Sequence, residues 1–73
     1  MNNKTICKIL FRSYREVERY VLYQIKFNKD NLTKNDMNKM QSTLYDSLKA
    51  LSRYITDNTY NLIDLRIESI FNK

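Results

Sequence analysis

Apolar residues recur at steps of three and four along the first part of the chain, from about Thr5 to Phe27. Such steps place side chains on one face of an α-helix, whereas a half-buried strand alternates with a period of two. The spacing therefore predicts an amphipathic helix whose apolar face packs on the rest of the protein. Its apolar positions are Ile6, Ile9, Leu10, Tyr14, Val17, Tyr20, Val21 and Ile25.

A local signal for the start of a second helix surrounds Thr33. Thr33 is a favourable N-cap residue, and Asp36 stands three residues later, where a capping box has Glu or Gln. Leu32 and Met37 flank the cap at the spacing of a hydrophobic staple. We therefore expect a helix that begins at Lys34. Its apolar seam has near-heptad spacing, as in a helical hairpin or coiled coil, and comprises Met37, Met40, Leu44, Leu48, Leu51 and Ile55.

Two polar stretches, residues 28–36 and residues 56–59, separate three helical segments. The last segment is short and runs to about Phe71. Leu62 and Leu65 widen its apolar side, which predicts that this helix is covered on two faces or meets a partner. The main apolar residues of this segment are Tyr60, Ile63, Ile67, Ile70 and Phe71.

The composition agrees with an all-helical fold of limited size. The 73 residues include no glycine and no proline, which removes the usual residues of tight turns and of Gly-rich phosphate loops. We therefore predict an all-α fold, a single small domain over residues 1–73 with a long helical hairpin and a short C-terminal helix. So small a domain buries a small core, and the lone Cys7 allows no internal disulfide. We expect either self-association as a homo-oligomer or low stability of the isolated chain.

The chain lacks the residues on which most catalytic and metal sites depend. It has no histidine, and Cys7 with carboxylates alone would be a poor zinc site. We therefore expect no enzymatic activity, no cofactor and no metal. A lone thiol indicates a reducing compartment, and no apolar run reaches the roughly 18–20 residues of a membrane span. We expect a cytoplasmic protein.

A row of cations runs along one face of the first predicted helix. At about 100° per residue the row occupies an arc of roughly 80° opposite the apolar face. Pairs such as Arg12–Glu16 and Arg15–Glu18 would weaken its field. With a net charge of +5, the row indicates a surface for phosphates or for an acidic partner, and a merely solvated helix face is the alternative. This basic row comprises Lys4, Lys8, Arg12, Arg15, Arg19 and Lys26.

The start of the second predicted helix carries the pattern NK-x-x-L-[ST]-x-x-[DE]-[LM], which resembles the longest helix of the Hha/YmoA family of small enterobacterial regulators. Residues 4–25 look similar to the first two helices of that family, given one inserted residue. The family's Ala-Ala-Asp-His-Arg run corresponds to residues 43–47, with Tyr45 at the position of its partner-binding Asp and Asp46 one step later. The family's C-terminal Trp is absent. The matching positions are Asn28, Lys29, Leu32, Thr33, Asp36 and Met37, with Ser42, Leu48 and Leu51 in register.

The resemblance implies an all-helical, non-enzymatic regulator that binds the N-terminal oligomerisation region of an H-NS-type nucleoid-associated protein. The basic row would then add weak, nonspecific DNA affinity to the complex, and the protein would be nucleoid-associated. The expected protein-partner residues are Met40, Tyr45, Asp46 and Lys49.

Two other interpretations stay open. Residues 44–55 are similar to the Leu-Tyr-Arg helix of mitochondrial LYR-motif adaptors, although Asp46 stands where that family has Arg. The hairpin alone would suit a small co-chaperone or secretion adaptor. Such a protein would sheathe a partner helix through Met37, Met40 and Leu44, because methionine side chains adapt to varied surfaces.

Overall fold

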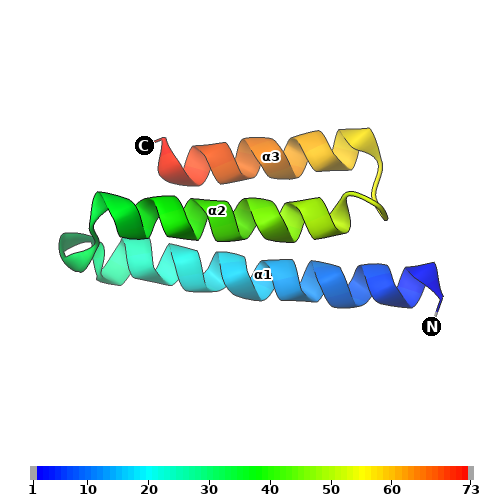
Figure 1. Cartoon of the computed structure of the whole chain (residues 1–73), viewed down its shortest axis with the longest axis horizontal. Coiled ribbons are helices and arrows are strands. Elements are labelled where there is room, and N and C mark those ends of the chain that lie inside the picture. The colour runs from blue at the N-terminus through cyan, green and yellow to red at the C-terminus, as the bar shows by residue number, and fades with distance from the viewer. Residues whose placement is uncertain (1, 73) are drawn as a thin grey trace.

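The computed structural model describes residues 2–72 and contains three α-helices and one short 3-10 turn (Figure 1). No strand occurs within these residues, which confirms the all-α fold. None of the three helices combines the length and the apolar character that a membrane crossing requires, as judged over residues 2–72. The elements are α1 (Asn3–Phe27), η1 (Lys29–Asn31), α2 (Lys34–Leu51) and α3 (Asp57–Phe71).

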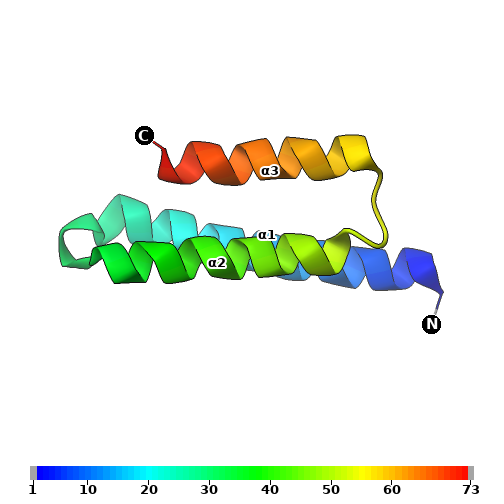
Figure 2. The same ribbon diagram turned by 45° about the horizontal axis from the view of Figure 1, so that its top comes forward.

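The three helices pack as a three-helix bundle. α1 and α2 make an antiparallel hairpin, and α3 runs back along α2, which lies between α1 and α3 in Figure 1. In the turned view of Figure 2, α1 passes behind α2 while α3 stays above both, so the three helices do not share one layer. At the η1 end the hairpin extends beyond the last turn of α3 (Figure 1). The end of the hairpin is therefore a two-helix structure.

Each helix begins at a polar side chain that caps it. Asn2, Thr33 and Thr56 each accept a hydrogen bond from the backbone N–H three residues later, at 2.9, 3.1 and 3.2 Å. These bonds satisfy amide donors that have no partner inside the helix. The caps explain why α1 begins two residues before the expected Thr5, and why α3 begins at Asp57, inside the stretch that the sequence marked as a break.

Of the three helices, α2 has the most complete N-terminal cap. The Thr33 hydroxyl accepts from the amide of Asp36, and the Asp36 carboxylate accepts from the amide of Thr33 at 3.0 Å. This reciprocal pair confirms the predicted capping box and the predicted start at Lys34. The hydrogen bonds from Thr33 lower the pKa of Asp36 below its ordinary value. Leu32 and Met37 are both half-buried, and their packing as a staple stays a prediction.

The expected extent of α2 is corrected, and the predicted single helix at the start of the chain is confirmed. α2 ends at Leu51 rather than continuing to Ile55, which lies in the connection to α3 and still packs against the core. Residues 4–25, which look similar to two helices of the family, lie in one continuous helix, α1, of 25 residues, as the three- and four-residue spacing predicted. An unbroken α1 keeps its exposed cations in one line along the bundle.

The core lies where the three helices face one another. On α2 it uses the predicted seam, so Leu44 is fully buried while Met37 and Met40 lie half-buried at the edge. A partner helix could reach this seam only if α1 or α3 moved away. The buried apolar residues are Tyr14, Val21, Leu44, Leu48, Leu51, Ile63 and Ile67.

Candidate functional site

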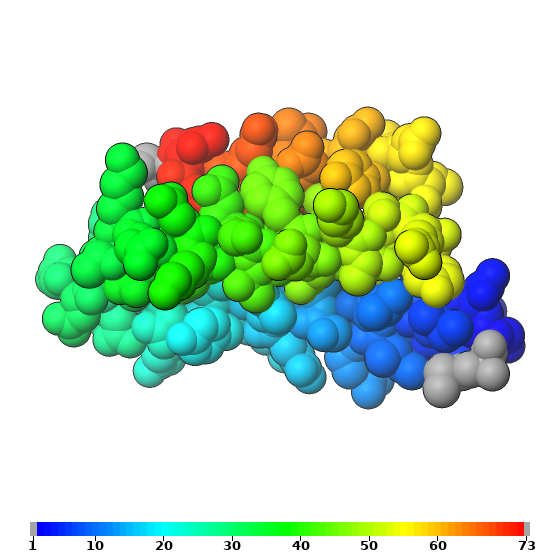
Figure 3. All heavy atoms as spheres, in the orientation of Figure 1, coloured from blue at the N-terminus to red at the C-terminus, as the bar shows by residue number. Residues whose placement is uncertain are grey.

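All six side chains of the basic row are exposed along α1. The buried apolar residues of α1, Tyr14 and Val21, lie on the other side of the same helix, so packing leaves the row in solvent. Figure 3 shows side chains of α1 standing out along one edge of the bundle. The predicted phosphate-facing residues therefore occupy a free surface of the protein.

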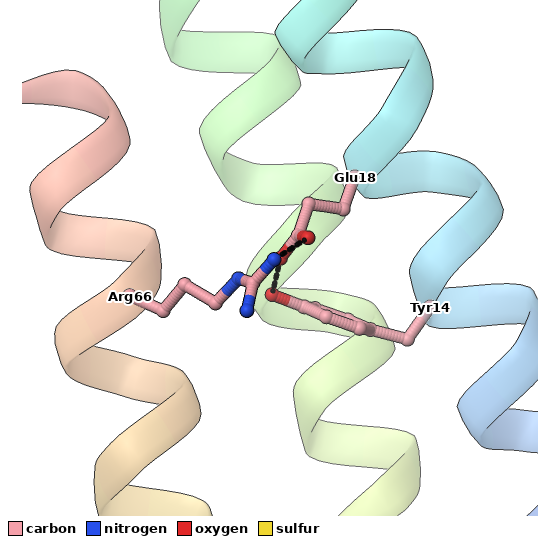
Figure 4. A network of polar contacts seen from close by, with 3 residues as sticks. All are labelled: Tyr14, Glu18 and Arg66. Atoms are coloured by element: carbon pink, nitrogen blue, oxygen red, sulfur yellow. Dashed lines mark hydrogen bonds and ion pairs between the residues drawn. The ribbon is translucent and has the colours of Figure 1, made fainter.

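The carboxylate of Glu18 does not neutralise this row. Glu18 is only 4% exposed, and it accepts a hydrogen bond from Arg66 of α3, with Nη2 2.7 Å from Oε1 (Figure 4). Within residues 2–72 this is the ion pair that the structure forms, so the expected Arg12–Glu16 and Arg15–Glu18 pairs are absent there. The Arg15–Glu18 pair does not form because Glu18 is turned toward α3, whereas Glu16 is exposed and forms no ion pair within the described residues. The row consequently carries more unpaired charge than the sequence indicated.

Glu18 also accepts a hydrogen bond from the phenol of Tyr14, at 2.8 Å from Oε2 (Figure 4). Burial, and then this bond to the carboxylate, raise the pKa of Tyr14 far above its ordinary value. Both carboxylate oxygens are thus occupied inside the protein. The sequence does not reveal this cluster, because nothing in the spacing of α1 distinguishes a buried glutamate from a surface one. The cluster holds α3 against α1.

The connection between α2 and α3 adds a cation to one end of the row. Arg53 shares an open hollow of about 600 Å³ with Lys4, Lys8 and Cys7. The Cys7 thiol lies 3.8 Å from the carbonyl oxygen of Tyr54, to which it donates a weak hydrogen bond. Sequence reasoning missed Arg53 because only the folded hairpin brings the end of α2 to the start of α1. The basic surface therefore spans two elements at this end.

The expected protein-partner residues separate into two groups. Asp46 and Lys49 are exposed and line an open hollow of about 700 Å³ between α1 and α2, here called the α1–α2 groove. Met40 is half-buried at the core edge, and Tyr45 is half-buried near Asp64 of α3; burial and this carboxylate raise the pKa of Tyr45. The structure thus leaves Asp46 and Lys49 together on a free surface and uses the other two for packing. Further groove residues are Ile6, Leu10, Ala50, Ser52, Arg53 and Tyr54.

Three aromatic side chains on the last turns of α1 are exposed and together form what we call the aromatic cluster, Tyr20, Tyr23 and Phe27. The ring centroids of Tyr23 and Phe27 lie 4.8 Å apart at 45°, and Lys26 Nζ lies 5.4 Å from the Phe27 ring centroid. The three- and four-residue spacing predicts Tyr20 on the core face of α1. It lies instead at the margin of that face, where α2 leaves it open.

No group of three or more His, Cys, Asp or Glu side chains that could hold a metal ion occurs within residues 2–72. Comparisons with protein-family models, curated proteins and solved structures found no match for this chain. The surfaces described above, together with the sequence resemblance, are therefore the grounds for a functional proposal.

Proposed function

We propose that this protein is a non-enzymatic modulator of gene expression that docks on a DNA-bound partner protein and adds its basic row to the DNA contacts. The observation that carries the proposal is the exposure of all six cations of the row, none of which forms an ion pair within residues 2–72. Such charge without a base-reading element supports weak, sequence-independent binding to the phosphates of duplex DNA.

The dimensions of α1 suit this role. At about 1.5 Å per residue, the row from Lys4 to Lys26 extends roughly 33 Å, a length over which duplex DNA presents many phosphates. Each phosphate that a cation neutralises adds about 0.9 to the slope of log affinity against log salt. Six cations are too few for tight binding at physiological salt. A partner that holds them next to DNA raises their effective concentration and makes them useful.

The proposed partner is an H-NS-type nucleoid-associated protein, and the sequence resemblance to the Hha/YmoA family supports that choice. The α1–α2 groove is the proposed docking surface, with Asp46 as the carboxylate that receives a basic side chain of the partner. Leu10, which lines the groove, lies about 160° around α1 from the middle of the basic row. A partner in the groove therefore leaves the row free for DNA.

The co-chaperone and LYR-like adaptor functions are the alternatives. The co-chaperone would need the α2 seam, and Leu44 of that seam is fully covered by the bundle. A co-chaperone would therefore have to open the core before it could bind a partner helix, which costs packing free energy. A modulator that docks through the exposed groove needs no such opening. This difference favours docking through the exposed groove.

The first experiment measures docking. Binding of the N-terminal oligomerisation region of an H-NS-type protein is titrated calorimetrically with the wild type, Asp46→Lys and Asp30→Lys. Asp30 is exposed on η1, away from the groove, and makes the same change of charge. We expect Asp46→Lys to weaken binding at least tenfold and Asp30→Lys to leave it unchanged. No binding by the wild type, or equal binding by both variants, would contradict the proposed partner or groove.

The second experiment measures the DNA contribution of the row. Duplex DNA is titrated with the complex at several salt concentrations, comparing wild type with a variant in which Arg12, Arg15 and Arg19 are alanine. The salt slope should fall by about 2–3 units, with partner affinity unchanged. A control variant replaces two cations outside the row, Lys29 and Lys34, and should lower the salt slope less than the row variant does. Equal slopes for the wild type and the row variant would show that the row is only a solvated face.

A further inference from the structure

We infer that the C-terminal half of α1 binds single-stranded nucleic acid, with bases stacked on the aromatic cluster and phosphates held by Arg19 and Lys26. This inference does not rest on the proposed partner, and it shares with the proposed duplex contacts only Arg19 and Lys26 of the basic row. The bases of a duplex are stacked on one another and give side chains no free faces, whereas an unpaired strand offers both faces and backbone.

The exposure of the aromatic cluster is the first observation. Tyr20, Tyr23 and Phe27 are 60%, 56% and 62% exposed, although the same helix buries Tyr14 almost completely. Three large rings within about two helical turns leave flat, apolar faces in water. Base–aromatic stacking is sequence-tolerant because every base has a flat face. The cluster therefore offers a platform for consecutive bases.

The charge around the cluster is the second observation. Residues 19–39 contain five lysines and arginines against two aspartates. Lys26 lies over the ring of Phe27, and Arg19 and Lys26 are the last cations of the basic row, directly beside the cluster on the helix surface. Lysine is depleted in the cores of protein–protein interfaces, whereas stacking rings edged by cations are typical of single-strand binding surfaces. The composition thus favours a nucleic acid over a protein.

The third observation is an open hollow beside Tyr20. It measures about 340 Å³, and Lys39 of α2 supplies a cation at its wall while Leu32 and Met40 supply apolar surface. Asp36 also lines it, with its carboxylate held by the Thr33 amide in the cap of α2. Gln24 adds a side-chain amide, a group that can hydrogen-bond the edge of a base. Because α3 ends before the hairpin does, the third helix does not extend over this end of the bundle (Figure 1). A strand can therefore cross from the rings of α1 into the hollow against α2.

The test uses dye-labelled strands of about 12 nucleotides in an anisotropy titration at low salt, with the whole protein. Four probes are compared: single-stranded DNA, single-stranded RNA, an abasic strand of equal charge, and duplex DNA. We expect the wild type to prefer both intact single strands over the abasic strand. Tyr23→Ala and Phe27→Ala should each weaken single-strand binding about fivefold or more, while duplex binding changes less than twofold. The comparison of DNA with RNA shows which of the two single strands the protein binds more tightly.

Substitutions that preserve a ring provide the control for stacking. Tyr23→Phe and Phe27→Tyr should bind like the wild type, whereas Tyr23→Leu, which keeps apolar bulk without an aromatic face, should bind like Tyr23→Ala. Leu62→Ala, at an equally exposed apolar position on α3, should have no effect. Circular dichroism confirms that each variant keeps its helices.

Three results would overturn the inference. Equal affinity for the abasic and intact strands would show that charge alone binds them. Full affinity of Tyr23→Leu would show that stacking is not involved. Loss of self-association or partner binding in the alanine variants, with single-strand affinity retained, would show that the cluster is a protein interface. None of these results bears on the salt slope of the complex on duplex DNA, so this inference and the proposed function can fail separately.

Discussion

Arg66 of α3 donates a hydrogen bond to the buried carboxylate of Glu18 on α1, with Nη2 2.7 Å from Oε1 (Figure 4). The pair joins two helices that otherwise pack mainly on α2. Arg66 is 61% exposed while Glu18 is almost completely buried. The buried carboxylate thus depends on a cation that solvent partly screens.

Removing either partner of this pair should destabilise the fold. Arg66→Ala leaves the buried carboxylate with Tyr14 alone and should cost about 1–2 kcal/mol, below the range for fully buried pairs because Arg66 is exposed. Glu18→Ala also removes the bond to Tyr14 and should cost about 2–3 kcal/mol. Urea denaturation measures both, and the double mutant gives the coupling energy. As a control, Arg12→Ala should change the free energy of unfolding by less than about 0.5 kcal/mol. A coupling energy near zero would show that the Arg66–Glu18 pair contributes nothing to stability.

A leucine in the core and a leucine on the surface should behave very differently. Leu48→Ala creates a cavity at a fully buried position and should cost about 3 kcal/mol. Leu62→Ala removes the same atoms from a side chain that is 60% exposed, and at concentrations where the protein is a monomer it should change the stability by less than about 0.5 kcal/mol. Thermal or urea unfolding compares the two, and similar losses would mean that another surface covers Leu62.

The capping box should make the stability of the fold depend on pH in the acidic range. The folded pKa of Asp36 lies below its ordinary value of 3.8, so the box stabilises the fold above that value and the benefit disappears as the pH falls through the folded pKa. The stability difference between wild type and Asp36→Ala should therefore be largest near neutral pH and shrink below about pH 3.8. Thr33→Ala should cost about 1 kcal/mol at neutral pH. A difference that does not vary with pH would contradict the charged cap.

Tyr14 should resist ionisation in alkaline solution. Because the fold raises its pKa, the unfolded chain loses this proton first, and the contribution of Tyr14 to stability falls as the pH rises above the ordinary value of 10.0. Absorbance titration of phenolate should show late titration for Tyr14, and Tyr14→Phe should remove that step. Tyr14→Phe should also flatten the alkaline decline of stability. An unchanged titration curve in the variant would contradict the buried hydrogen bond.

Self-association should involve the outer side of α3. Leu62 and Leu65 are both about three-fifths exposed, which agrees with the two-sided apolar pattern of this helix. Sedimentation at micromolar concentration should detect association or low stability of the wild type. Changing both leucines to serine should reduce the association, and the same change in the exposed pair Asn58 and Asn61 provides a control. A stable, cooperative wild-type monomer would show that three helices suffice.

Much of the helical architecture follows from local signals in the sequence. Thr33 and Asp36 predicted the start of α2 because a capping box involves only neighbouring residues. The three- and four-residue steps of α1 predicted which cations would be exposed, since helix geometry alone puts them opposite Tyr14 and Val21. These features depend on residues within a turn or two of one another, so no knowledge of the tertiary structure is needed.

The roles of Glu18, Arg53 and the aromatic cluster depended on the tertiary structure. Glu18 has the spacing of a surface residue, and only the packing of α3 buries it against Arg66. Arg53 lies beside the same hollow as Lys4 because the antiparallel hairpin brings the end of α2 back to the start of α1. Tyr20 is exposed because the packing of the hairpin leaves its side of α1 open. A helical pattern specifies the faces of a helix, whereas the neighbour that covers each face depends on contacts between residues distant in the sequence.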